Sequence, residues 1–130
     1  MGLNAIRSLD YTVLLCRDIH AMRSFYEDVM GFAVEHDGEA WVSFRIGAAL
    51  LTLRPRIEDE PWSDGAVTPE SASVQLAFRV PPSAVEACFA ELKAAGVAIV
   101  REPTDLPAWR HRALFFRDPE SNLLEIYAEY

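Results

Sequence analysis

Apolar and polar side chains alternate along this chain first with the period of a strand and then with the period of a helix. Residues 8–16 follow the two-residue repeat of a β-strand, and residues 19–29 place large apolar side chains at helical spacing. Asp18 stands where a residue would cap that helix, and Gly31 stands where one would end it. The first thirty residues therefore predict a strand followed by one helix.

Shorter apolar runs follow, separated by turn-forming residues. They predict three strands, at residues 32–35, 40–46 and 49–54. Asp37-Gly38 is a strong signal for a hairpin between the first two, and Gly47 favours a turn between the last two. The first half of the chain therefore has the order β-α-β-β-β.

The second half repeats this order. A strand is expected at residues 72–80, and Ser83 and Glu86 form the pattern of a capping box for a helix that Gly96 ends. Three strands then follow, at residues 97–102, 111–117 and 123–130. Because both halves share the same order and spacing, we expect a duplicated module in an α+β chain.

Between the halves lies a stretch rich in acidic residues and proline. The pattern predicts module one at about residues 6–56, an acidic linker at about 57–71 and module two at about 72–130, together one domain. A solvated loop is the simpler interpretation of the linker. Trp62 keeps a second one open, in which the loop covers a ligand or contacts a partner.

Composition restricts the function more than it defines it. The 130 residues carry a formal net charge of −8 without a basic stripe, which argues against binding nucleic acid or an anionic membrane. No segment resembles a signal peptide or a membrane span. The two cysteines, Cys16 and Cys88, occupy apolar positions, as expected for buried thiols in a reducing compartment. We therefore expect a cytoplasmic protein.

The final hairpin holds the most informative side chain. Residues 118–122, Asp-Pro-Glu-Ser-Asn, separate two strands that are apolar on both faces, and Glu125 lies in the second of them. A carboxylate in such a place must be paired, protonated or bound to a cation. An ion pair with Arg79 or Arg54 is one interpretation of Glu125, and a contact with a ligand is the other.

Four segments in this order resemble the vicinal oxygen chelate superfamily, which includes glyoxalase I, bleomycin-resistance proteins and extradiol dioxygenases. The segments are Tyr11–Asp18, Phe25–Phe32, Gln75–Val80 and Asp118–Ile126. The resemblance implies two tandem βαβββ modules that form a rolled, half-open mixed sheet around a cavity, in a homodimer.

Metal-dependent members of that superfamily place ligands on the first and last strands of each module. The resemblance puts Tyr11 and Thr52 at these positions in module one, with Leu51 as the alternative to Thr52, and Gln75 and Glu125 in module two. Only Gln75 and Glu125 are plausible oxygen ligands, and the set has no histidine, the usual anchor of a transition metal. We therefore expect no catalytic metal; a divalent metal held by Gln75 and Glu125 is the alternative.

The resemblance also implies a ligand cavity on one face of the strands. Strand parity and the turn before residue 111 indicate which residues face this cavity. The candidate ligand-binding residues are Tyr11, Thr52, Arg54, Gln75, Arg79, Trp109, His111 and Tyr127. Trp41 is expected in the cavity wall, and Glu125 is the candidate catalytic residue. For Trp109 and His111, an exposed cluster at the rim is the alternative.

Three functions remain open at this point. The favoured one is a binder of a small molecule, similar to the bleomycin-resistance branch and without a catalytic metal. The alternatives are a metal-dependent lyase or dioxygenase acting on a substrate with vicinal oxygens, and a degenerate dimeric interaction module.

Overall fold

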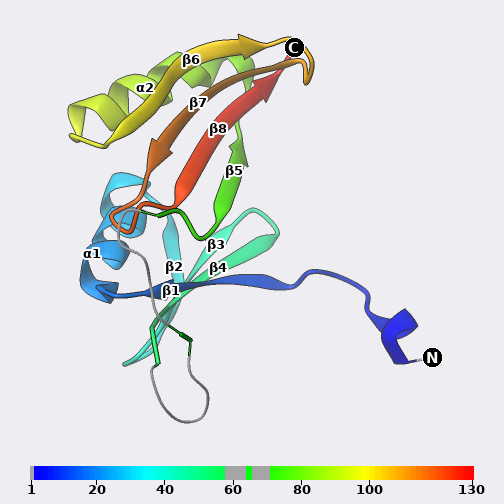
Figure 1. Ribbon diagram of the computed structural model, residues 1–130, viewed down its shortest axis with the longest axis vertical. Coiled ribbons are helices and arrows are strands. Elements are labelled where there is room, and N and C mark those ends of the chain that lie inside the picture. The colour runs from blue at the N-terminus through cyan, green and yellow to red at the C-terminus, as the bar shows by residue number, and fades with distance from the viewer. Residues whose placement is uncertain (1, 58–63, 66–70) are drawn as a thin grey trace. The chain divides into compact units, whose positions relative to one another are not determined.

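The computed structural model describes residues 2–57, 64–65 and 71–130. The chain forms two compact units, Met1–Gly65 and Ala66–Tyr130, and each contains one four-stranded mixed sheet (Figure 1). The α+β class and the two βαβββ modules are thus confirmed. Most of the acidic linker, including Trp62, lies outside the described residues, so the domain boundaries stay a prediction.

The described part of the first unit contains a short 3-10 helix, one longer helical segment and one sheet. In chain order its elements are η1 (Gly2–Ala5), β1 (Tyr11–Cys16), α1 (Ile19–Ser24), η2 (Phe25–Val29), β2 (Ala33–Asp37), β3 (Val42–Ile46) and β4 (Ala49–Pro55). The strand order is β1-β4-β3-β2. β1 runs parallel to β4, whereas β3 is antiparallel to both β4 and β2. β1 and β2 are therefore the two edges of this sheet.

The predicted first helix is present, but its second half has π geometry. Asp18 caps it as expected, because its Oδ1 accepts a hydrogen bond from the amide of Ala21 at 3.1 Å. From Phe25 onward the helix widens, and the amide of Met30 donates to the carbonyl of Phe25. Phe25 and Tyr26 are both buried in the core. Gly31 follows with a φ of 71°, a left-handed conformation that favours glycine.

The core of this unit lies between the helix and one face of the sheet. Tyr26 and Phe44 are fully buried there, with ring centroids 6.3 Å apart, and Leu53 of β4 is fully buried beside them. Since side chains alternate along a strand, the neighbours of these residues point to the opposite face. That second face carries the candidate functional residues.

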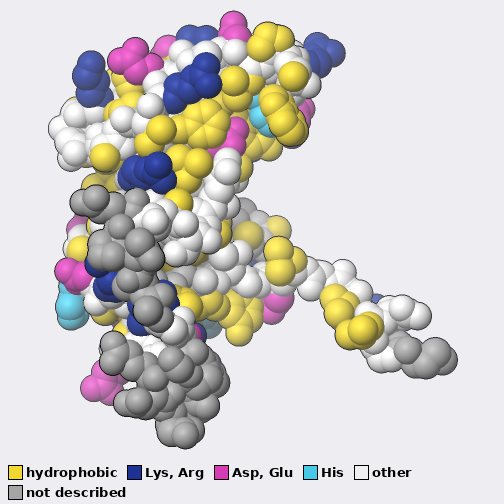
Figure 2. Space-filling view, in the orientation of Figure 1, with side chains coloured by type: hydrophobic (Ala, Val, Ile, Leu, Met, Phe, Trp, Pro, Cys, Tyr) yellow, Lys and Arg dark blue, Asp and Glu magenta, His cyan; other side chains and the backbone are white. Residues whose placement is uncertain are grey.

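The chain before β1 extends away from this sheet, as the blue segment in Figure 1 shows. The sequence predicted a strand from residue 8, but β1 begins at Tyr11. Leu3, Ile6 and Leu9 on this segment are 72–91 % exposed, and Figure 2 shows the apolar side chains along it. Leu9 thus follows the alternating pattern without joining the sheet.

The second unit repeats the arrangement. Its elements are β5 (Gln75–Arg79), η3 (Pro82–Ala84), α2 (Val85–Ala94), β6 (Ile99–Leu106), β7 (His111–Arg117) and β8 (Leu123–Glu129), with strand order β5-β8-β7-β6. β5 is parallel to β8, and the other pairs are antiparallel. α2 contacts β6, β7 and β8, and Val85 and Leu92 of this helix are buried.

Two local predictions in this unit are wrong. The capping box does not form, because Pro82–Ala84 adopts a short 3-10 helix and α2 begins without a side-chain cap. Residues 103–107 were expected to form a turn, yet β6 continues to Leu106. Two register shifts between β6 and β7 accommodate Pro103, which has no amide hydrogen to donate, on this edge strand.

The predicted final turn has an evident cause. Oδ1 of Asp118 accepts hydrogen bonds from the amides of Glu120 and Asn122, and its Oδ2 accepts one from the side-chain amide of Asn122. Asp118 and Asn122 are both buried. This network stabilises the turn, and the turn determines where β8 and Glu125 begin their pairing with the sheet.

Candidate functional site

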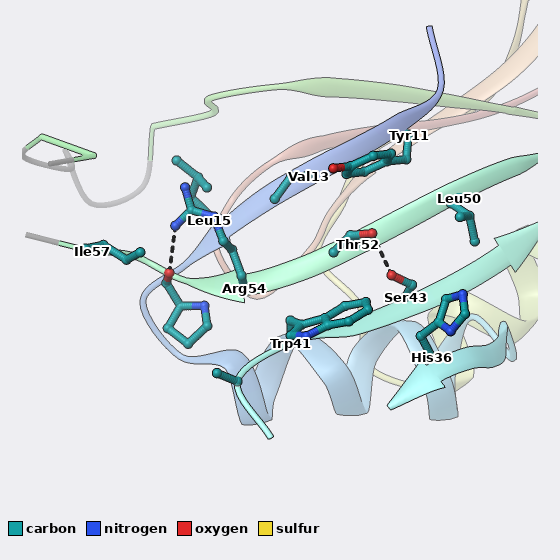
Figure 3. Close-up of a pocket in the computed structure, with 12 residues that line it drawn as sticks. Tyr11, Val13, Leu15, His36, Trp41, Ser43, Leu50, Thr52, Arg54 and Ile57 are labelled. Carbon is teal, nitrogen blue, oxygen red and sulfur yellow. Dashed lines mark hydrogen bonds between the residues drawn. The ribbon is translucent and has the colours of Figure 1, made fainter. Parts of the chain in front are cut away.

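The open face of the first sheet forms a pocket of about 910 Å³ (Figure 3). Its lining includes Tyr11, Thr52 and Arg54, which strand parity assigned to this face. Alternate residues of the same two strands, Val13, Leu15 and Leu50, also line it. The parallel register places them in facing pairs, for example Val13 beside Thr52. Their role in binding a ligand stays a prediction.

Aromatic side chains form one wall of the pocket. Tyr11 extends over the pocket from β1, and Trp41, just before β3, lies across the pocket from Tyr11. The His36 ring contacts the Trp41 indole, with ring centroids 5.9 Å apart. Both Tyr11 and Trp41 are about half exposed, so their rings are accessible to a bound molecule. This wall suits a flat or aromatic ligand.

Two hydroxyl groups lie at the floor of the pocket. Ser43 on β3 and Thr52 on β4 are register partners, and their side-chain oxygens are 2.7 Å apart. Both residues are buried. A hydroxyl can donate one hydrogen bond and accept others, so this pair retains capacity for a polar atom of a ligand.

Arg54 borders the pocket at the end of β4, and a carboxylate holds its side chain. Asp64 accepts two hydrogen bonds from the Arg54 guanidinium, each of 2.9 Å, and a third from the amide of Ile57 at 2.6 Å. The Asp64 side chain is 5 % exposed. These contacts hold the pKa of the Asp64 carboxyl well below its usual range, and they raise the pKa of Arg54.

The second unit gathers a separate polar cluster on its sheet. The side-chain amide of Gln75 donates to Oε1 of Glu125 at 3.2 Å, and Nδ1 of His111 lies 3.9 Å from Oε2 of the same carboxylate. The His111 ring stacks on Tyr127 with centroids 4.2 Å apart. Four predicted site residues, Gln75, Glu125, His111 and Tyr127, therefore lie together on this sheet. The Glu125 side chain is 12 % exposed.

The predicted ion pair of Glu125 with Arg79 is not formed. Arg54 binds Asp64, and Arg79 instead lies 3.0 Å from the carboxylate of Glu129. The register pairs Arg79 with Tyr127, which lies between Glu125 and Glu129 on the same face of β8, and Glu125 already accepts a hydrogen bond from Gln75. Trp109 occupies the turn between β6 and β7 and is 72 % exposed.

The donor atoms fit a divalent metal poorly. Within the described residues, no group of three or more His, Cys, Asp or Glu side chains could hold a metal ion. Of the four family positions, Thr52 already contacts Ser43, and the Gln75 amide turns a nitrogen rather than an oxygen towards Glu125. Among the described residues, too few oxygen ligands remain at these positions for magnesium or calcium, and no cluster of nitrogen or sulfur ligands suits zinc.

Sequence reasoning missed two polar residues that line the pocket, Ser43 and His36, and it missed Asp64, which binds the lining residue Arg54. Ser43 follows Trp41 by two residues, so parity along its strand would have found it. His36 directly precedes the Asp37-Gly38 hairpin signal; its side chain is 56 % exposed and still lines the pocket. The sequence does not single out Asp64 as a functional residue, because it is one of several carboxylates in an acidic stretch.

A helix-covered sheet in each unit, with parallel first and last strands, defines the class of paired βαβββ proteins. Residues 8–126 match the Glyoxalase/Bleomycin resistance protein/Dioxygenase superfamily, and the chain belongs to this family. None of the helices in the described part of the chain is long and apolar enough to cross a membrane.

Known relatives cover nearly the whole chain. Virulence protein STM3117 of Salmonella typhimurium is 29 % identical over 124 residues, which are 93 % of this chain and 83 % of that protein. Its crystal structure covers 96 % of this chain and 98 % of its own at 28 % identity, with a TM-score of 0.75. A glyoxalase/bleomycin resistance protein/dioxygenase from Nocardioides has a TM-score of 0.80 at 21 % identity, covering 98 % of this chain and 88 % of its own. That last similarity concerns the fold alone.

Proposed function

We propose that this protein binds a neutral, largely apolar small molecule in the module-one pocket and does so without a catalytic metal. The observation that carries the proposal is the pocket itself. About 910 Å³ of space is lined mainly by aliphatic and aromatic side chains, with one pair of hydroxyls at its floor. Ligand pockets in proteins usually have this size and this combination of apolar walls with a few polar groups.

Electrostatics support a neutral ligand. Arg54 is the only lysine, arginine, aspartate or glutamate among the described residues that line the pocket, and Asp64 binds it. Among these described lining residues there is no carboxylate to attract a cation either. Recognition therefore rests on the apolar walls, the aromatic rings and hydrogen bonds to Ser43 and Thr52.

A fluorescent probe tests this function directly. Anilinonaphthalene is neutral and aromatic, and its emission rises in apolar surroundings, so we expect saturable binding to the protein. Trp41→Ala should weaken binding, because it removes one wall of the pocket. Trp109→Ala is the matched control, since this exposed tryptophan lies outside the pocket. Equal losses in both variants would overturn the assignment.

A second candidate is a metal-dependent lyase or dioxygenase centred on module two. The observation in its favour is the direct contact between Gln75 and Glu125, which occupy the two metal positions of the family in module two. His111 and Tyr127 would border a substrate there. Against it stands the poor donor set, so the metal content of the purified protein is the measurement that separates the two candidates.

Assembly and location belong to the same proposal. We expect a homodimer, because β1 and β5 are edge strands of their sheets and such edges favour pairing. We expect it in the cytoplasm, because Cys16 and Cys88 are free thiols, as in a reducing compartment. Light scattering coupled to size exclusion measures the mass in solution. A dimer that shows neither probe binding nor bound metal would favour the third interpretation, a degenerate interaction module.

A further inference from the structure

Asp64 does not line the pocket, yet it binds Arg54, the one permanently charged side chain among the described residues that do. The guanidinium of Arg54 presents two parallel donors to the two oxygens of this carboxylate, and Nη1 also donates to the carbonyl of Pro55 at 3.0 Å. This forked geometry is the one that a carboxylate, sulfonate or phosphate ligand would otherwise use.

We propose that Asp64 determines the specificity of the pocket for charge. By occupying Arg54, it makes the pocket disfavour anions and accept neutral aromatic molecules. This inference rests on the proposed function, because it assumes that the pocket binds a ligand. It adds a positioning residue outside the pocket lining and predicts which class of ligand is excluded.

The surroundings of Asp64 show that it is held in place. Its carboxylate accepts the amide of Ile57, and its own amide donates to the carbonyl of Ile57 at 2.7 Å. Arg56 donates to the backbone carbonyls of Asp64 and Gly65. The depressed pKa of Asp64 keeps the carboxylate ionised throughout the neutral range. An anion entering the pocket would therefore meet a fixed negative charge beside Arg54.

The expected consequence is a reversal of preference when the carboxylate is neutralised. Asp64→Asn replaces the carboxylate with an uncharged side chain of the same shape and removes the negative charge that Asp64 places on Arg54. We expect the affinity for an anionic aromatic ligand to rise relative to that for its neutral analogue. The change should be about 10- to 100-fold, the range that one hydrogen bond to a charged group contributes.

Two probes that differ by one anionic group make the experiment sharp. Anilinonaphthalene and anilinonaphthalene sulfonate share the same rings, and the ratio of their dissociation constants reports charge preference alone. The ratio is measured for the wild type, for Asp64→Asn and for Glu91→Gln. The last variant changes the net charge equally, but at an exposed position on α2. We expect only Asp64→Asn to shift the ratio towards the sulfonate.

A double variant and the wild type itself complete the test. Arg54→Met with Asp64→Asn should not gain sulfonate binding, because the cation that would attract the sulfonate is gone. An unchanged ratio in Asp64→Asn overturns the inference, as does a wild type that binds both probes equally. If Asp64→Asn does not fold, a wild type that binds both probes equally still overturns the inference. Failure of the wild type to bind anilinonaphthalene at all overturns the proposed function instead.

Discussion

Ser43 Oγ and Thr52 Oγ1 lie 2.7 Å apart on the pocket face of β3 and β4, in side chains that are almost wholly buried. Each hydroxyl has the other as its partner across the two strands. The pair is thus both a part of the candidate site and a part of the fold. A change to one member affects stability as well as binding.

Thr52→Val should destabilise the protein by about 1–3 kcal/mol, because it leaves the buried Ser43 hydroxyl without this partner. Urea denaturation measures the loss of unfolding free energy. The double variant Ser43→Ala with Thr52→Val removes both polar groups and should cost less than Thr52→Val alone. Additive losses in the double variant would show that the two hydroxyls do not interact.

Gly38→Ala should displace Trp41 from the pocket wall. A Cβ at residue 38 would lie 2.6 Å from Nε1 and 2.8 Å from Cδ1 of the Trp41 indole, so the ring must move. We expect anilinonaphthalene affinity to fall by about 2- to 10-fold, the contribution of one aromatic pair. Gly2→Ala is the control, because a Cβ there meets nothing within 4 Å. Unchanged affinity in Gly38→Ala would show that Trp41 does not contact the probe.

Strand parity was sufficient to predict much of the pocket. Alternation is a local property of the sequence, so it correctly placed Tyr11, Thr52 and Arg54 on one face of the first sheet. It also placed Gln75 with Glu125, because β5 and β8 are parallel neighbours in the family's fold.

Ion-pair partners could not be predicted in the same way. Arg54 binds Asp64, ten residues later, because the chain turns back after β4. Nothing in the acidic stretch distinguishes this carboxylate from its neighbours, and charge alone suggested Glu125 as a partner. The π geometry from Phe25 onward was equally hidden, since its apolar residues also fit the spacing of an ordinary helix.

Asp64 should make the stability of the protein sensitive to acid. Because its pKa is lower in the folded state than in the unfolded chain, its contribution is fully present above the unfolded pKa of about 3.9 and is lost as the pH falls below that value. Asp64→Asn should therefore be less stable than the wild type at neutral pH, and this difference should shrink below about pH 4. Thermal unfolding of both proteins across this range checks the prediction. A difference that stays constant with pH would show that Asp64 makes no ionisation-dependent contact.

Glu125 provides the decisive test of the metal-dependent alternative. Its carboxylate accepts a hydrogen bond from Gln75 and has His111 nearby, but two or three scattered donors make a weak site for a divalent cation. We expect protein purified without chelator to contain no stoichiometric metal, and its melting temperature to be unchanged by added Zn, Ni, Fe, Mn or Mg. Glu125→Gln should give the same flat response. Near-stoichiometric metal in the wild type, or a rise of several degrees that Glu125→Gln abolishes, would instead establish module two as a metal centre with Glu125 as a ligand.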